Sequence, residues 1–182
     1  MELGCGSLFL AFALAFGPDP VLPAYLYLAA VCLALSLIDI DTRRLPDRLT
    51  LPSYAVFVLL LSVGVVASAP PGALVRALLG GLAMFGLYFA LWFAYPSGMG
   101  FGDVKLAGLL GVATAWVGWG AWAVGVFFGF LYGGAFGIVL LLARGASRKT
   151  KVPYGPFLVA GGFTGVLAGG QLFADYLSLT AV

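Results

Sequence analysis

Long runs of apolar residues, separated by short breaks, determine which folds are open to this chain. Of its 182 residues, 63% are hydrophobic and only 9% are charged, whereas a soluble domain is usually about 45–50% apolar and about 25% charged. A chain of this length could not hide so much apolar surface from water, so most of its surroundings must be lipid. Lipid offers no partner for free backbone N–H and C=O groups, and each run must therefore be helical.

Seven apolar runs are separated by breaks that hold proline, glycine or charged residues. A transmembrane helix needs about 20 mostly apolar residues, and most of the runs approach this length, although the first is short. We expect an all-α fold: a polytopic membrane helical bundle of about seven transmembrane helices, forming one integral membrane domain over residues 1–182. The runs cover residues 3–16, 21–38, 51–67, 73–95, 104–117, 121–143 and 157–177.

Lysine and arginine residues are expected to gather on one side of the membrane. Seven crossings bring the breaks around residues 41–49, 95–103 and 144–152 to the same side, and these breaks and their edges hold every basic residue except Arg76. Cytoplasmic loops carry an excess of Lys and Arg, so we expect this side to be cytoplasmic, with the N-terminus inside and the C-terminus outside. Arg76 is expected to extend from the fourth run toward the membrane surface.

The composition excludes several classes of function. The chain has no histidine, which removes Ser-His and Cys-His catalysis and any His-based metal site. Cys5 and Cys32 lie inside apolar runs and form no C-x-x-C pair, so we interpret them as small packed hydrophobes and expect no metal site. The net charge of +2 is too small to indicate a nucleic-acid partner.

Glycines recur every four residues in the last two runs. Glycines at this spacing let helix backbones approach closely, and we interpret them as packing surfaces, with a substrate groove as the alternative. They are Gly125, Gly129, Gly133 and Gly137 in the sixth run, and Gly161, Gly165 and Gly169 in the seventh.

Two carboxylates lie at ends of apolar runs on the expected cytoplasmic side. Asp39 closes the second run, and Asp103 follows a glycine-rich turn at residues 98–102, just before the fifth run. An ionisable residue in such a place is a candidate functional residue. At similar depth, the two carboxyls could hydrolyse a peptide, one accepting a proton from water and the other donating one to the carbonyl. Two neighbouring carboxyls cannot both ionise readily, so such a pair would share a proton.

Each carboxylate also has a purely structural explanation. Asp103 could be the N-cap of a helix that begins at Val104. Asp39 could be an interfacial carboxylate that pairs with Arg43, one helical turn further on. Asp41 is a third acidic candidate in the same segment, as is Asp47, and composition does not choose among them.

The glycines of the turn before Asp103 suggest a place for a substrate. Gly100 and Gly102 can adopt positive φ and allow another backbone to come close. An extended peptide could lie against such a turn and exchange hydrogen bonds with it. Two other classes of function stay open on these residues: a proton-coupled transporter with paired carboxylates, and a non-catalytic assembly subunit.

Three stretches, in this order, resemble the signatures of prepilin peptidases, the type IV leader peptidase family. The first is Asp39-Ile-Asp-Thr-Arg-Arg-Leu-Pro46, continued by Asp47-Arg-Leu-Thr-Leu-Pro52. The second is Met99-Gly-Phe-Gly-Asp-Val-Lys105, which contains a G-x-G-D motif, and the third is Lys151-Val-Pro-Tyr-Gly-Pro-Phe157. G-x-G-D alone is a weak signal, but three ordered motifs among seven apolar runs are specific.

The resemblance implies an intramembrane aspartic endopeptidase of the cell inner membrane. The family's catalytic aspartates correspond to Asp39 and Asp103, and the spacing to Pro46 selects Asp39 over Asp41. Members cut the basic leader from prepilins or pseudopilins at the cytoplasmic face, usually after a glycine and without a metal, so we expect no cofactor. The first run begins at Leu3 and the paired C-x-x-C motifs that many members carry, which are linked to N-methylation, are absent from the sequence; the resemblance therefore predicts cleavage and leaves N-methylation open.

Acidic residues beside the catalytic pair are candidates for binding a basic leader. Asp41 and Asp47 are well placed for this role, although they could equally serve only to neutralise neighbouring arginines at the lipid headgroups. Exposed ion pairs are typically worth only ~0.2–1 kcal/mol, so we expect a modest effect on substrate binding. The full set of substrate-binding candidates is Gly100, Gly102, Asp41, Asp47 and Lys105.

Overall fold

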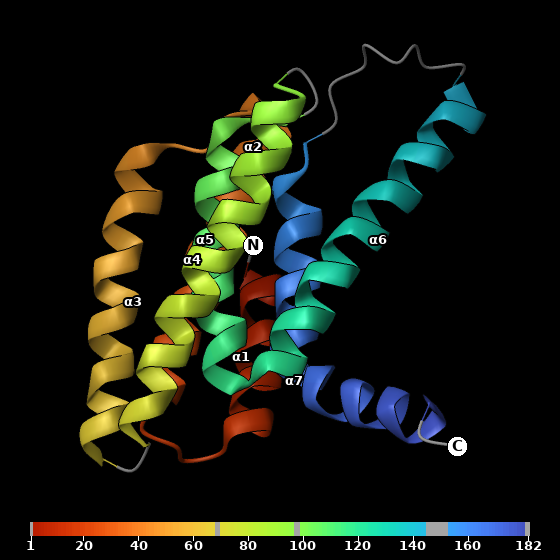
Figure 1. Cartoon of the computed structure of the whole chain (residues 1–182). Helices are drawn as coiled ribbons and strands as arrows, with labels where there is room; N and C mark the ends of the chain where they lie inside the picture. The colour runs from red at the N-terminus through yellow and green to blue at the C-terminus, as the bar shows by residue number, and fades with distance from the viewer. Residues whose placement is uncertain (1, 68–69, 97–98, 145–152, 181–182) are drawn as a thin grey trace.

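The computed structural model describes residues 2–67, 70–96, 99–144 and 153–180. Over these residues the chain forms seven α-helices and no strand, which confirms the expected all-α fold (Figure 1). The helices are α1 (Glu2–Phe16), α2 (Leu22–Thr42), α3 (Asp47–Ala67), α4 (Pro71–Ala94), α5 (Phe101–Val117), α6 (Trp119–Arg144) and α7 (Gly155–Thr180).

Five of these helices are long and apolar enough to cross a membrane: α2, α3, α4, α6 and α7. α1 and α5 are apolar but shorter, with 15 and 17 residues. The arrangement is that of a multi-pass membrane protein. Most of the basic break predicted at residues 144–152, and residues 97–98 of the break predicted at residues 95–103, lie outside the described residues.

The helices extend beyond the apolar runs on the side where the basic residues lie. α2 continues past Asp39 to Thr42, and α3 begins at Asp47 rather than Leu51. Hydropathy marks where lipid contact ends, but a helix ends only where its backbone hydrogen bonds end. In α3 the first turn is closed by Leu49 and Thr50, whose N–H groups both donate to the carbonyl of Pro46.

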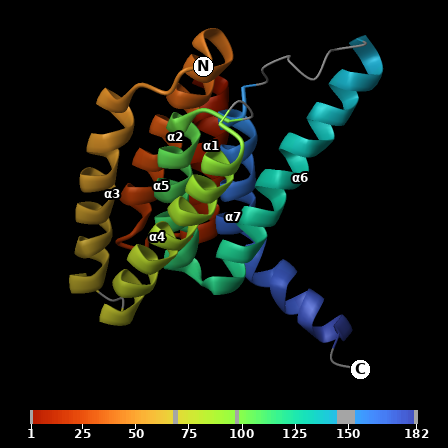
Figure 2. The same cartoon turned by 45° about the horizontal axis from the view of Figure 1, so that its top comes forward.

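α5 is the central helix of the bundle. Figures 1 and 2 show it between α3 at one edge and α6 at the other, with α4 and α7 beside it. Every residue from Asp103 to Trp116 is buried except Lys105. A helix that is apolar all round is buried on all sides, and this burial fixes where the first turn of α5 can lie.

Arg76 of α4 holds the other end of α5. Its Nε donates to the carbonyl of Ala115 at 2.7 Å, and its Nη2 donates to the carbonyl of Trp116. The last carbonyls of a helix have no partner within it, so this half-buried guanidinium satisfies two of them. The sequence alone did not indicate this contact between Arg76 and α5.

Glycines bring α6 and α7 into direct backbone contact. A Cβ added to Gly165 would lie 2.8 Å from Cα of Gly125, and one added to Gly169 would lie 2.6 Å from Cα of Ala121. The packing interpretation of these glycines is thereby confirmed. Gly137 is an exception, because nothing lies within 4 Å of its added Cβ. Sequence reasoning missed a similar contact between α4 and α5, where Gly111 meets Gly80 and Gly81.

Replacing Gly165 by Ala is expected to destabilise the bundle by about 1–3 kcal/mol, the usual penalty for overpacking. The new methyl group would collide with the backbone of α6, which cannot rotate away as a side chain can. Gly134→Ala is the matched control, since nothing lies within 4 Å of its added Cβ. Thermal unfolding in detergent checks the pair: equal Tm values for the two variants would contradict the packing role.

Candidate active site

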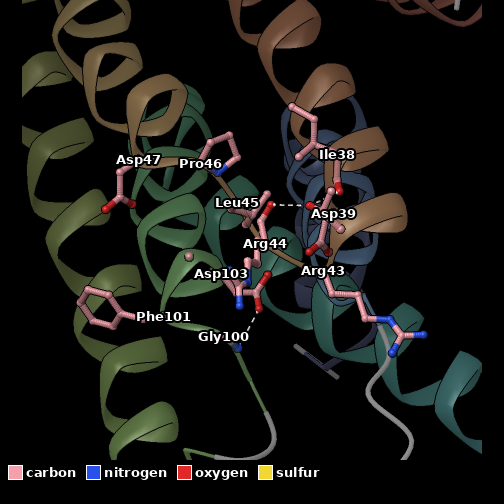
Figure 3. A pocket seen from close by; sticks show the side chains of 12 residues that line it. Ile38, Asp39, Arg43, Arg44, Leu45, Pro46, Asp47, Gly100, Phe101 and Asp103 are labelled. Atoms are coloured by element: carbon pink, nitrogen blue, oxygen red, sulfur yellow. Dashed lines mark hydrogen bonds between the residues drawn. The ribbon is translucent and has the colours of Figure 1, made fainter.

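A pocket of about 740 Å³ opens at the end of the bundle where α2 ends and α3, α5 and α7 begin (Figure 3). One wall comes from the end of α2 and the connection that follows it, and the opposite wall comes from the first turn of α5. The lining residues are Ile38, Asp39, residues 42–47 and residues 100–103.

Asp39 lies in the last turn of α2 and is only 4% exposed. Its Oδ2 accepts a hydrogen bond of 2.9 Å from the backbone N–H of Gly155, the first residue of α7. No ion pair joins it to Arg43 within the described part of the chain. Arg43 instead ends α2 in a left-handed conformation, with φ of 53°, and Figure 3 shows its side chain extending away from the carboxyl.

Asp103 is the third residue of α5 and is 7% exposed. Its Oδ2 accepts a hydrogen bond of 3.1 Å from the N–H of Gly100, while its own N–H donates to the Gly100 carbonyl. Asp103 is therefore inside the helix, where its carboxyl accepts the N–H of the N-cap residue as the third residue of a capping box does, and the alternative that made it an N-cap was wrong. Its Oδ1 is buried and has no hydrogen-bond partner among the described residues.

The two aspartates reach the same hollow from different helices. Figure 3 shows the Asp39 carboxyl and the Asp103 carboxyl both directed into the space between the end of α2 and the start of α5. Buried carboxylates are rare unless they are paired or hydrogen-bonded. Two such groups in one pocket can bind a water molecule and a peptide carbonyl between them.

The region from α2 to α6 matches a known family. The model of the type IV leader peptidase family aligns with residues 26–138, more than half of the chain, and this segment contains both aspartates. The chain belongs to the type IV leader peptidase family.

Curated relatives of this family member cover almost all of its length. A prepilin leader peptidase/N-methyltransferase from Stutzerimonas stutzeri is 36% identical over 178 residues, which are 97% of this chain and 60% of that protein. Proteins of the same name from Pseudomonas putida and Aeromonas salmonicida are 33% and 36% identical over 180 residues. The chain thus spans about three fifths of the length of the relatives it matches. No solved structure matches it.

Of the other residues expected to bind substrate, three line the pocket and two do not. Asp47, Gly100 and Gly102 line the pocket with the two aspartates. Asp41 is exposed in the last turn of α2 and does not line it. Lys105 lines a second, largely apolar pocket of about 500 Å³ between α3, α4 and α5.

The glycines of the G-x-G-D motif do not adopt the backbone conformation that was expected of them. Gly100 has φ of −77°, and neither it nor Gly102 adopts positive φ. A Cβ added to Gly102 would lie 2.8 Å from Cβ of Leu45. The close approach at this glycine is therefore made by the connection between α2 and α3, which packs onto the start of α5.

Sequence reasoning did not assign a role to Gly155, although it lies in the third family-like stretch. Besides donating its N–H to Asp39, it leaves no room for a side chain, because an added Cβ would lie 2.8 Å from Asp39 Oδ2. Its neighbour Tyr154 anchors this point to α6, with its Oη donating to the Gly129 carbonyl at 3.3 Å. Burial raises the pKa of the Tyr154 phenol, so this group remains a neutral donor.

Proposed function

We propose that this member of the type IV leader peptidase family is an aspartic endopeptidase that removes the basic leader from type IV prepilins or pseudopilins. The observation that carries the proposal is the pair of buried carboxylates, Asp39 and Asp103, directed into one pocket at the end of an apolar bundle. The names of the curated relatives support the substrate class. The proposal covers cleavage and not N-methylation, because the only roles that we assign to residues of the pocket are roles in hydrolysis.

Hydrolysis requires the two carboxyls to be in different protonation states. The ionised carboxyl accepts a proton from a water molecule, which attacks the carbonyl carbon of the scissile peptide. The protonated carboxyl donates its proton to the carbonyl oxygen, and the tetrahedral intermediate collapses as the leaving amine is protonated. The unpartnered Oδ1 of Asp103 offers a contact for the water or the carbonyl. Gly155 and Gly100 hold Oδ2 of each aspartate and fix the geometry.

We place the pocket at the cytoplasmic face of the membrane. The end of the bundle that holds the pocket also carries Arg43, Arg44 and Arg48, in or next to the connection between α2 and α3. Cytoplasmic ends of membrane helices are rich in such residues. A leader segment on the same side of the membrane would reach the pocket without crossing the bilayer.

Purified protein in liposomes, mixed with a synthetic prepilin peptide, is expected to cut the peptide once, at the boundary between leader and mature segment. Mass spectrometry of the products measures the cut, and a pH-sensitive dye inside the liposomes measures proton flux. Proton flux without cleavage would indicate a transporter and not a peptidase. Neither activity would favour an assembly subunit, and either result would overturn the proposal.

A further inference from the structure

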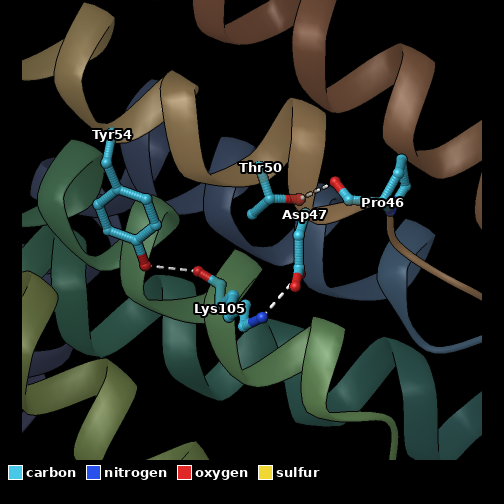
Figure 4. Close-up of polar contacts among 5 residues, drawn as sticks. All are labelled: Pro46, Asp47, Thr50, Tyr54 and Lys105. Atoms are coloured by element: carbon cyan, nitrogen blue, oxygen red, sulfur yellow. Dashed lines mark hydrogen bonds and ion pairs between the residues drawn. The ribbon is translucent and has the colours of Figure 1, made fainter.

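Lys105 of α5 makes two polar contacts with α3 (Figure 4). Its Nζ pairs with Oδ1 of Asp47 at 2.6 Å, and its backbone carbonyl accepts a hydrogen bond from Oη of Tyr54. The ammonium also lies 5.0 Å from the centre of the Phe101 ring. The Lys105 side chain is 17% exposed, whereas that of Asp47 is 57% exposed, so the lysine is held by the protein while the aspartate is accessible from the pocket.

The two contacts lie next to the pocket wall that residues 43–46 form. Asp47 begins α3 and directly follows residues 43–46, which form one wall of the pocket. Leu45 of that wall packs on Gly102. Lys105 is two residues beyond Asp103 on the same helix, so one residue ties the wall and α3 to the helix that carries a proposed catalytic group.

α3 also packs against α2, where Tyr27 Oη and Ser53 Oγ lie 3.1 Å apart, but it has few polar contacts with α5. It stands at the edge of the bundle in both views (Figures 1 and 2). Beside its first two turns, the second pocket leaves a largely apolar space lined by Leu51, Tyr54 and Lys105. The ion pair and the tyrosine hydrogen bond are thus the polar contacts that join the start of α3 to α5 among the described residues.

We propose that Lys105 is a positioning residue that clamps the start of α3, and with it residues 43–46, against α5, so that the pocket wall facing Asp103 keeps its place. The proposal rests on the peptidase function proposed above. It differs from the expectation that Asp47 and Lys105 bind substrate, because each charge is satisfied by the other. Asp47 acts through Lys105 and not by attracting a basic leader.

A charge exchange distinguishes the clamp from direct leader binding. Asp47→Lys and Lys105→Asp should each lower kcat/KM about tenfold, because each places like charges side by side, and the double exchange should restore most of the loss. If Asp47 binds a basic leader instead, a lysine at this position repels it, and the double variant is as poor as Asp47→Lys or poorer, chiefly through KM. Asp175→Lys, an exposed charge reversal on α7, is the matched control and should leave kcat/KM unchanged.

Amide hydrogen exchange tests the clamp without an activity assay. It also allows a milder variant. Lys105→Met keeps most of the apolar stem and removes the charge. It should accelerate amide exchange over residues 43–50 several-fold, because local opening becomes easier, while exchange in α6 stays the same. Unchanged exchange over residues 43–50, or a double exchange that restores nothing, would overturn the clamp. A wild-type protein that cuts no prepilin overturns the peptidase function, yet faster exchange in Lys105→Met would still support the clamp.

Discussion

Asparagine at either Asp39 or Asp103 is expected to slow prepilin cleavage by about a thousandfold or more, within the range that loss of an acid–base group produces. The amide has the shape of the carboxyl and still accepts the N–H of Gly155 or Gly100, so both proteins should fold. It cannot take up and release the proton that the reaction moves. Initial rates on a prepilin peptide, with Tm as the test of folding, measure the effect.

Asp41→Asn is the matched control for these two variants. Asp41 is two residues from Asp39 on the same helix, but it is exposed and does not line the pocket. Its variant should keep a rate within about threefold of wild type, in line with the weak energetics of exposed charges. A wild-type rate in Asp39→Asn or in Asp103→Asn would remove that residue from the catalytic pair.

Alanine at Gly155 is expected to lower kcat about a hundredfold, although the change removes no side chain and keeps the backbone N–H. Its added Cβ would lie 2.8 Å from Oδ2 of Asp39, so either the carboxyl or the start of α7 must move. A misplacement of about 1 Å in a catalytic site can cost about 10²-fold in rate. Steady-state kinetics on the prepilin peptide measure the loss.

Gly137→Ala separates this effect from a general intolerance of alanine. Both glycines belong to helices, but nothing lies within 4 Å of the Cβ added at position 137, and this variant should cleave like wild type. If Gly155→Ala cleaves at the same rate as Gly137→Ala, the contact with Asp39 does not position the carboxyl.

Hydropathy predicted the seven helices because a backbone in lipid has only one way to satisfy its polar groups. It could not predict where the helices end, since beyond the apolar runs a helix is ended by local contacts. Hydropathy does not report the left-handed conformation of Arg43 that ends α2. Nor does it report the Pro46 carbonyl that closes the first turn of α3. The contact of Arg76 with α5 was missed for a related reason, because its partners are carbonyls of another helix.

The placement of Asp39 and Asp103 at one end of the bundle could be predicted, because charge in the loops sets the direction of every helix. Their immediate partners could not. Gly155 is 116 residues from Asp39 along the chain, and Asp47 is 58 residues from Lys105. Such contacts depend on how helices pack, so no local pattern reports them. Gly102 was misjudged for the same reason: the close neighbour that requires a glycine is Leu45.

The hydrogen bond from Gly155 to Asp39 can form only late in the synthesis of the chain. A ribosome makes α2 and α5 before α7, so both aspartates are synthesised before the amide that holds one of them. Until α7 docks on α2, the Asp39 carboxyl lacks this partner. On the proposed mechanism, the arrangement of the two carboxyls is therefore completed by a late step of assembly, and a partly inserted chain has both carboxyls but not the arrangement that would let them cut a neighbouring polypeptide.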